Sequence, residues 1–203
     1  MVTPGSVRWG SLDGFLARVL EGGVDAVQLR VKELEARPLL RLAEVVRRRT
    51  TEFGALFIVN DRVDLAIAAG ADGVHLGQDD LPVAAARAQL ASAGHPGALI
   101  GWSTHQESEV RAGAGSGADY LGVGPVYATP TKPGRPAVGL ELVRFAADRA
   151  GLPFFAVGGI DLATLPGVIG AGARRVAVVR ALTEAEDPGK VAAAMAAMLR
   201  AAG

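Results

Sequence analysis

The chain has 203 residues, half of them hydrophobic, with 21 basic and 21 acidic side chains and no cysteine. The balanced charge gives no global indication of nucleic acid or an anionic membrane as a partner. The lack of cysteine excludes disulfides, thiolate metal sites and cysteine nucleophiles. The first residues lack the basic-then-apolar layout of a signal peptide, and the longest uninterrupted apolar run, Val191–Leu199, is much shorter than the roughly 20 residues of a membrane span. We therefore expect a cytoplasmic protein with small-molecule partners, and the sequence leaves open whether it forms a homo-oligomer.

An internal repeat indicates the fold. Each copy follows an amphipathic stretch and opens a short apolar run, which is typical of a helix that ends at a left-handed glycine and leads into a buried strand. The four copies are Gly23-Val24-Asp25-Ala26-Val27, Gly70-Ala71-Asp72-Gly73-Val74, Gly117-Ala118-Asp119-Tyr120-Leu121 and Gly172-Ala173-Arg174-Arg175-Val176.

Further apolar runs with strand character lie between these copies, at Leu56–Val59, Ala98–Trp102 and Pro153–Val157. Helical periodicity fills the gaps, for example at Pro38–Thr50 and Leu140–Ala150. Strands that alternate with helices predict a parallel sheet, because parallel strands need a crossover connection.

Seven strands are readily counted, and the eighth would be the first of the chain, where only Met1–Thr3 precedes the turn at Pro4-Gly5. We expect an α/β fold, a (β/α)8 TIM barrel that forms a single domain over residues 1–203. Either its first strand is truncated or the true start codon lies upstream. A doubly wound open sheet is the alternative, and the even spacing of the repeat disfavours it.

Polar residues fall where a barrel enzyme carries its site, at the carboxyl ends of the strands. Gln28, Arg30 and Lys32 alternate with apolar residues, so their side chains are expected on one face, towards the barrel mouth. Burying such cations is costly unless an anion pairs with them. The alternative is a strand end that continues into a solvated loop.

Two acids follow neighbouring strands. Asn60 and Asp61 end one apolar run and Asp80 follows the next, and each of them is also a suitable helix N-cap. Two carboxylates at adjacent strand ends can instead hold Mg²⁺, which takes one or two carboxylates and completes its shell with water and substrate phosphate. The basic residues beside them suit a magnesium pyrophosphate.

Hydroxyl and histidine side chains follow the next strand, where Ser103 either contacts a ligand or caps a helix. His75 and His105 are as well explained by structural roles as by catalytic ones, so a histidine general base is not expected.

The longest loop, 124–136, is predicted to bind ligand or to act as a lid, and it carries Thr129, Thr131 and Lys132, which suit a phosphate. Gly159 and the pair Val179-Arg180 end the last two strands, where barrels of this kind bind phosphate through backbone amides. This pattern predicts a phosphorylated ligand without specifying which one.

Six motifs in order give the chain a resemblance to a known family. They are Gln-Leu-Arg-x-Lys, Asn-Asp-Arg-Val-Asp, Val-His-Leu-Gly-Gln-x-Asp-Leu-Pro, Ser-Thr-His, Gly-Val-Gly-Pro-Val-Tyr-x-Thr-Pro-Thr-Lys and Val-Gly-Gly-Ile. Together they resemble the thiamine-phosphate synthases, from about Gly22 to the C-terminus.

This resemblance implies a Mg²⁺-dependent transferase that couples hydroxymethylpyrimidine pyrophosphate to thiazole phosphate by an SN1-like reaction. It implies that Asp61 and Asp80 bind the metal, and that Ser103, Arg30 and Lys132 act at the reacting centre. The remaining implied contacts are Arg30, Lys32, Asn60 and Lys132 to the pyrophosphate, Gln28 near the pyrimidine, and Thr129, Thr131, Gly159, Val179 and Arg180 to the thiazole phosphate.

One departure from the family pattern lies at Arg180, where these enzymes usually carry a serine. A TenI-type thiazole tautomerase is the nearest alternative. That activity tends to have a histidine where this chain has Pro125, and it can lack the paired acids present here as Asp61 and Asp80. A non-catalytic paralogue that binds a phosphorylated ligand is the third interpretation, and it would tolerate loss of the metal and leaving-group residues.

Overall fold

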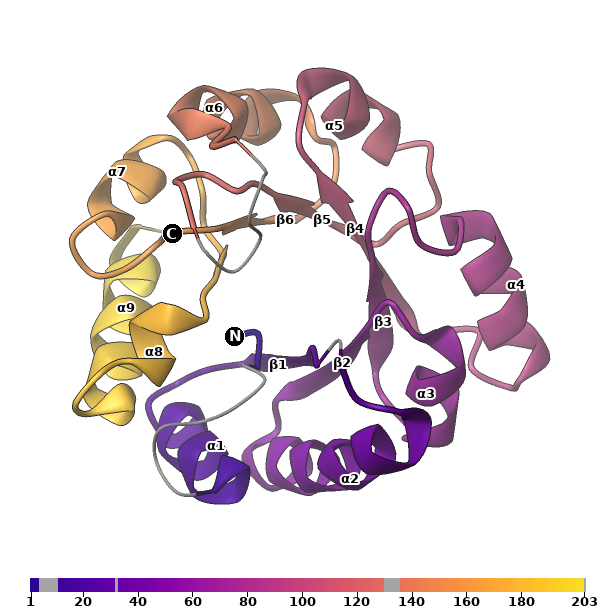
Figure 1. The fold of residues 1–203 in the computed structure, drawn as a ribbon. Coiled ribbons are helices and arrows are strands. Elements are labelled where there is room, and N and C mark those ends of the chain that lie inside the picture. Colours follow the sequence, from indigo (N-terminus) through magenta and orange to yellow (C-terminus); the bar gives the residue numbers. More distant parts are fainter. Residues whose placement is uncertain (4–10, 32, 130–135, 203) are drawn as a thin grey trace.

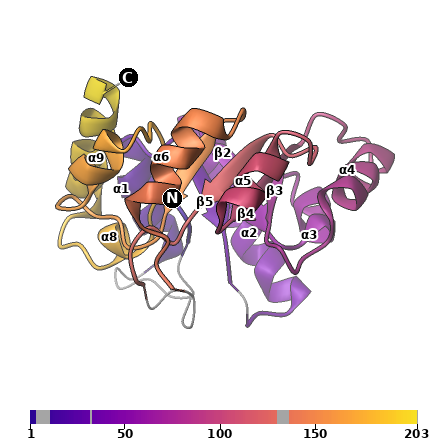
Figure 2. The ribbon, with the colours of Figure 1, turned by 90° about the horizontal axis from the view of Figure 1, so that it is seen from above.

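The computed structural model describes residues 1–3, 11–31, 33–129 and 136–202. Seven parallel strands form one sheet in chain order. The sheet curls into a ring with the helices around its outside (Figures 1 and 2). The strands are β1 (Ala26–Leu29), β2 (Leu56–Asn60), β3 (Gly73–Leu76), β4 (Leu99–Thr104), β5 (Tyr120–Val123), β6 (Phe154–Val157) and β7 (Val176–Ala177).

Helices connect the strands and flank them in the sequence. Those in the described residues are α1 (Leu12–Glu21), α2 (Ala36–Phe53), α3 (Val63–Ala68), α4 (Val83–Ser92), α5 (Glu107–Gly113), α6 (Gly139–Arg149), α7 (Leu165–Gly170), α8 (Arg180–Thr183) and α9 (Pro188–Ala202). The predicted alternation of strand and helix is confirmed.

Helix α2 is longer than its periodicity predicts, and local chemistry explains both ends. It begins before Pro38, which lies in the first turn, where a missing backbone N–H removes no helical hydrogen bond. It continues past Thr50 and ends at Gly54, whose φ of 65° is left-handed and carries no Cβ penalty in glycine.

The first three residues close the ring. Val2 forms a parallel bridge with Gln28 of β1, and the Thr3 N–H donates to the Gln28 carbonyl at 2.8 Å. On the other side, the Val2 N–H donates to the Val178 carbonyl at 3.0 Å, directly after β7. Figure 1 accordingly shows the N-terminus inside the ring. The predicted barrel is confirmed, and Met1–Thr3 occupy the place of its first strand through an isolated bridge.

The two faces of the strands have different surroundings, because successive side chains point to opposite sides. The outward side chains Val27, Phe57, Val74, Ile100 and Leu121 are fully buried against the helices. Burying each of them contributes about 1.5–3 kcal/mol relative to exposure. The inward side chains line a cavity inside the ring, so the hydrophobic core lies between strands and helices and leaves the interior for ligand.

The repeated Gly-Ala-Asp segments have a structural role at the amino ends of the strands. Asp72, just before β3, accepts a hydrogen bond from the buried backbone N–H of Phe57 on Oδ2 at 2.6 Å. Its Oδ1 lies 3.0 Å from Nη1 of Arg47 on α2. The Asp72 N–H in turn donates to the Phe57 carbonyl at 2.8 Å, so the two residues are joined in both directions.

Asp119 repeats this arrangement before β5. Its Oδ2 accepts from the Ile100 N–H at 2.7 Å and from Nη2 of Arg87 on α4 at 2.6 Å, and its own N–H donates to the Ile100 carbonyl at 2.7 Å. Each aspartate therefore ties a strand start to its neighbouring strand and to a helix. In a barrel this end serves stability rather than chemistry.

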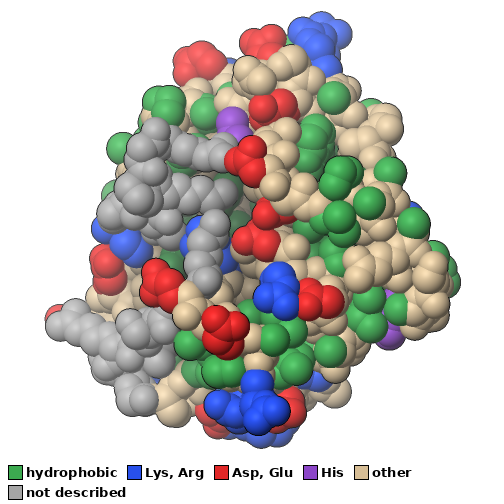
Figure 3. All heavy atoms as spheres, turned by 45° about the vertical axis from the view of Figure 1, so that its right-hand side comes forward, with side chains coloured by type: hydrophobic (Ala, Val, Ile, Leu, Met, Phe, Trp, Pro, Cys, Tyr) green, Lys and Arg blue, Asp and Glu red, His purple; other side chains and the backbone are tan. Residues whose placement is uncertain are grey.

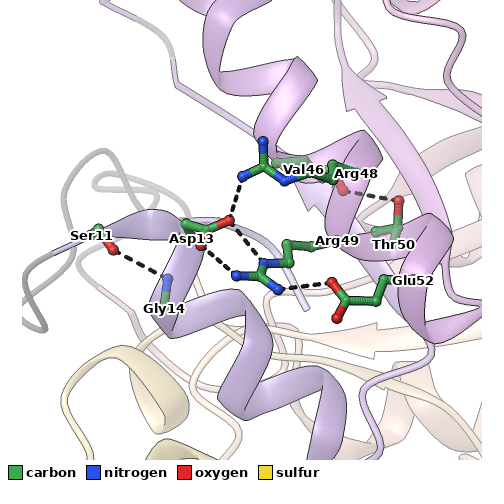
Figure 4. A network of polar contacts seen from close by, with 8 residues as sticks. All are labelled: Ser11, Asp13, Gly14, Val46, Arg48, Arg49, Thr50 and Glu52. Carbon is green, nitrogen blue, oxygen red and sulfur yellow. Dashed lines mark hydrogen bonds and ion pairs between the residues drawn. The ribbon is translucent and has the colours of Figure 1, made fainter.

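An ion-pair network joins α1 to α2 (Figure 4). Both oxygens of Asp13 accept from Arg49, at 2.8 and 2.5 Å, and Oδ1 also accepts from Arg48 at 2.6 Å. Arg49 donates in addition to Glu52 at 2.8 Å. The hydrogen bonds from Arg49 and then Arg48 lower the pKa of Asp13 to about 2.

Charge on the outer surface is mixed. On the face drawn in Figure 3, acidic and basic side chains lie among one another. Among the described residues, no helix is long and apolar enough to cross a membrane.

Candidate active site

A cavity of about 470 Å³ lies inside the ring. This volume is in the range of sites for small organic ligands. Eight of the residues expected to bind substrate line it, and they come from strand ends far apart in the sequence. They are Gln28, Arg30, Asn60, Ser103, Thr129, Gly159, Val179 and Arg180.

The other five expected residues fall into two groups. Lys32, Thr131 and Lys132 lie outside the described residues. Asp61 and Asp80 are described and half-buried, and they follow β2 and β3, but they are not among the residues that line the cavity.

The two acids are held in place by backbone contacts at neighbouring strand ends. Asp61 has a φ of 64°, a left-handed conformation that is uncommon outside glycine and that concentrates at functional sites, and its N–H donates to the His75 carbonyl at 2.8 Å. Asp80 accepts from the Gly77 N–H on Oδ2 at 2.6 Å. Neither acid takes the helix-capping role, since α3 and α4 begin after Arg62 and Pro82 without a side-chain cap.

The chemistry of the two carboxylates suits Mg²⁺. The described residues contain no group of three or more histidine, cysteine or acidic side chains placed to hold a metal. Mg²⁺ needs only one or two carboxylates because water and substrate phosphate supply its other ligands. Asp61 and Asp80 are the hard oxygen donors that such a site requires.

Of the three arginines that line the cavity, Arg30 and Arg180 were expected at the site from the sequence. Arg30 follows β1, and its backbone N–H is fixed by Thr3 Oγ1 at 2.9 Å. Arg180 begins α8, with its Nη1 3.9 Å from Glu184 Oε2. Gln28 and Arg30 both line the cavity, as their alternation predicted. Guanidinium groups are suited to phosphate because they present several N–H donors in a fixed plane.

The turn after β6 places the backbone of two glycines, which carry no side chain, at the cavity. Gly158 and Gly159 have φ values of 102° and 66°, which glycine adopts without strain. A methyl group on Gly159 would lie 2.6 Å from Tyr127 Cβ, so the loop after β5 packs directly on this turn. Asp161 closes the turn by accepting the Thr164 and Ala163 N–H groups at 2.9 and 3.0 Å, and the Thr164 contact is the main reason its pKa lies below the usual range.

The histidine on β3, for which the sequence allowed a structural or a catalytic role, lies inside the barrel. His75, on β3, lines the cavity, with Nε2 2.9 Å from Ser103 Oγ and Nδ1 3.2 Å from Tyr120 Oη. The available signal was strand alternation, since His75 stands at an inward position between Val74 and Leu76. His105 also lines the cavity, and its Nδ1 contacts the Gly124 carbonyl.

Similarity to known proteins shows the family of the chain. The family model described as "Thiamine monophosphate synthase" matches residues 1–182. The chain belongs to the thiamine monophosphate synthase family. A thiamine-phosphate synthase of Acidothermus cellulolyticus is 53% identical over 197 residues, which cover 96% of this chain and 91% of that protein. One of Gloeobacter violaceus is 58% identical over 171 residues, 84% of this chain, but the match spans only 49% of that longer protein.

Solved structures agree with this family and with the barrel. Thiamine phosphate pyrophosphorylase from Pyrococcus furiosus is similar over 99% of this chain and 94% of that chain, with a TM-score of 0.89 and 32% identity. A 3-hexulose-6-phosphate synthase, at 21% identity, a TM-score of 0.66 and 91% coverage of both chains, shares the fold alone.

Proposed function

We propose that the chain is a transferase that makes thiamine phosphate from hydroxymethylpyrimidine pyrophosphate and thiazole phosphate, with release of pyrophosphate. The observation that carries this proposal is the convergence of eight expected substrate-binding residues on one cavity of about 470 Å³. Membership of the thiamine monophosphate synthase family supports the choice of reaction.

The two anionic ends of the substrates are assigned to different parts of the cavity. Arg30 and Asn60 follow β1 and end β2, on the side of the two acids, and suit the pyrophosphate together with Lys32 and Lys132. Gln28 lies one inward position below Arg30 and suits the pyrimidine. The thiazole phosphate is assigned to the loop after β5 and the ends of β6 and β7, with Thr129, Thr131, Gly159, Val179 and Arg180 as its contacts.

The chemistry is a dissociative substitution. The bond between the exocyclic carbon of the pyrimidine and the pyrophosphate oxygen breaks, and its electrons leave with the oxygen. The thiazole nitrogen then uses its lone pair to form the new carbon–nitrogen bond. The protein has to neutralise the leaving group and exclude water from the cation, rather than supply a strong base. Arg30 and the Ser103 hydroxyl serve the first task, and the cavity inside the ring serves the second.

Asp61 and Asp80 are the residues proposed to hold Mg²⁺. When bound, the ion adds positive charge beside the departing pyrophosphate and so favours ionisation. Asp61 and Asp80 follow β2 and β3 and would hold the ion at these neighbouring strand ends, where its charge would add to that of Arg30.

We also propose that residues 1–203 act as one barrel unit in the cytoplasm. One continuous cluster of buried side chains, drawn from strands and helices along the described chain, supports the single unit. The cysteine-free composition suits a reducing compartment.

The test is a two-substrate assay with purified protein, in which thiamine phosphate and pyrophosphate are both quantified. We expect equal amounts of the two products, and no product when either substrate is omitted. Conversion of a thiazole carboxylate phosphate tautomer without any coupling would contradict the proposal and favour the tautomerase. Binding of thiazole phosphate without turnover would favour the non-catalytic paralogue.

A further inference from the structure

A hydrogen-bonded column of three side chains runs up the inner wall of the barrel. His75 on β3 and Tyr120 on β5 both pair in register with Gly101, which lies on β4 between them. The His75–Tyr120 hydrogen bond of 3.2 Å therefore crosses over the intervening strand. From His75, the second ring nitrogen reaches Ser103 Oγ at 2.9 Å, one inward position closer to the mouth.

Two glycines provide the space for this column. A methyl group at Gly101 would overlap both the Tyr120 ring and His75 Nδ1, and one at Gly122 would lie 3.0 Å from His75 Cε1. Glycine weakens a strand interior and often marks a close approach to the backbone. The column is thus built into the sheet, across the three neighbouring strands β3, β4 and β5.

The three groups allow two consistent directions for the hydrogen bonds. Burial, and secondarily the charge of Asp119, raise the pKa of Tyr120, so its phenol keeps its proton. If Tyr120 donates to Nδ1, a neutral His75 carries its hydrogen on Nε2 and donates to Ser103 Oγ. The hydroxyl hydrogen of Ser103 is then available to the cavity. In the opposite direction Ser103 would donate to His75 and present only lone pairs to an anionic leaving group.

The main chain of Ser103 is held independently of this column. Its carbonyl accepts from Gln78 Nε2 at 2.6 Å, and the residue is only 5% exposed. The torsion angle that places the hydroxyl hydrogen of Ser103 therefore remains to be fixed, and the hydrogen bond with His75 sets this angle.

We propose that Tyr120 and His75 are positioning residues that direct the Ser103 hydroxyl hydrogen towards the departing pyrophosphate. This inference rests on the proposed function. No proton is transferred along the column, and no bond other than the hydrogen bonds changes. The column orients the Ser103 hydroxyl before the reaction begins. A donor that already points at the developing charge does not have to reorient in the transition state.

The first test is the tautomer of His75, measured by ¹⁵N NMR of protein labelled on histidine. The chain has three histidines, and loss of one signal in His75→Asn assigns the resonances. We expect the hydrogen on Nε2 in the wild type and a mixture of tautomers in Tyr120→Phe. A hydrogen on Nδ1 in the wild type, alone or with one on Nε2, would overturn the proposal. This measurement does not depend on activity, so it decides the direction of the column even if the two-substrate assay fails.

The second test is kinetic. Tyr120→Phe removes only the phenolic oxygen, and we expect kcat to fall about tenfold, the effect of one lost hydrogen bond, with KM for both substrates unchanged. Thr50→Val is the matched control, because Thr50 is a fully buried hydroxyl that donates to the Val46 carbonyl at 3.0 Å within α2, away from the cavity (Figure 4). Equal kcat values for the two variants would overturn the proposal, because the phenol would then be merely structural.

Discussion

Replacing Asp72 by alanine should destabilise the barrel without slowing catalysis. The change removes the acceptor of the Phe57 N–H, which donates at 2.6 Å and belongs to a fully buried residue. A hydrogen bond to a charged group contributes about 1.5–3 kcal/mol. The ion pair with Arg47 is 28–34% exposed, and such a pair adds about 0–1 kcal/mol.

The expected loss in the free energy of unfolding is therefore about 2–3 kcal/mol, because the two contributions overlap at one carboxylate. For a chain of this length it corresponds to a decrease in Tm of roughly 4–12 °C. Urea unfolding followed by circular dichroism measures the first quantity, and calorimetry measures the second. kcat, measured well below the transition, should match the wild type because Asp72 lies at the amino ends of the strands.

Two further variants separate the two contributions to this loss of stability, the hydrogen bond with the Phe57 N–H and the ion pair with Arg47. Asp72→Asn keeps an acceptor oxygen for the Phe57 N–H and should lose about half as much stability. Arg47→Ala removes the ion pair and should cost about 1 kcal/mol or less. A change below about 0.5 kcal/mol for Asp72→Ala, which is the range of an ordinary surface substitution, would refute the structural role. A normal Tm with a reduced kcat would place Asp72 in the catalytic machinery instead.

The acids at the carboxyl ends of the strands should affect catalysis rather than stability when they are replaced. Asp61→Ala and Asp80→Ala should each lower kcat by about 100-fold or more while Tm stays near that of the wild type, and normal turnover in either variant would remove the metal assignment. Lys132→Ala should weaken catalysis more than stability, whereas an equal loss of Tm with an unchanged rate would make Lys132 structural. Arg180→Ser should be tolerated in the coupling assay, and a large gain in kcat/KM would mean that the native chain prefers another substrate.

The fold was predictable because its signal is periodic. Four glycine-led repeats, three of them with an aspartate two residues later, and the apolar runs between them are enough to indicate alternating strands and helices. The glycine ends of helices such as α2 follow from local chemistry. The extent of β7 was not predictable, because the two residues that pair there, Val176 and Ala177, are fixed by hydrogen bonds to β6. The repeated aspartates were recognised as a pattern, but their bonds to a neighbouring strand and helix depend on register.

The candidate site was predictable in part for the same reason. Eight of the expected substrate-binding residues line one cavity, since the carboxyl ends of parallel strands meet at one rim. The column of His75 and Tyr120 was missed, because it joins residues on two strands across a third. No local pattern shows that Gly101 leaves room for it. That Asp61 and Asp80 are not the N-caps of α3 and α4 likewise needed the observed starts of these helices, and the metal role of the two acids stays a prediction.

The most direct test of the account is product formation by the purified chain before and after removal of divalent metal. We expect thiamine phosphate from the two substrates in the presence of Mg²⁺, no product after EDTA, and full recovery when Mg²⁺ is added back. Product that persists in EDTA would contradict the metal role of Asp61 and Asp80. The absence of product from folded, Mg²⁺-loaded protein would contradict the synthase assignment itself.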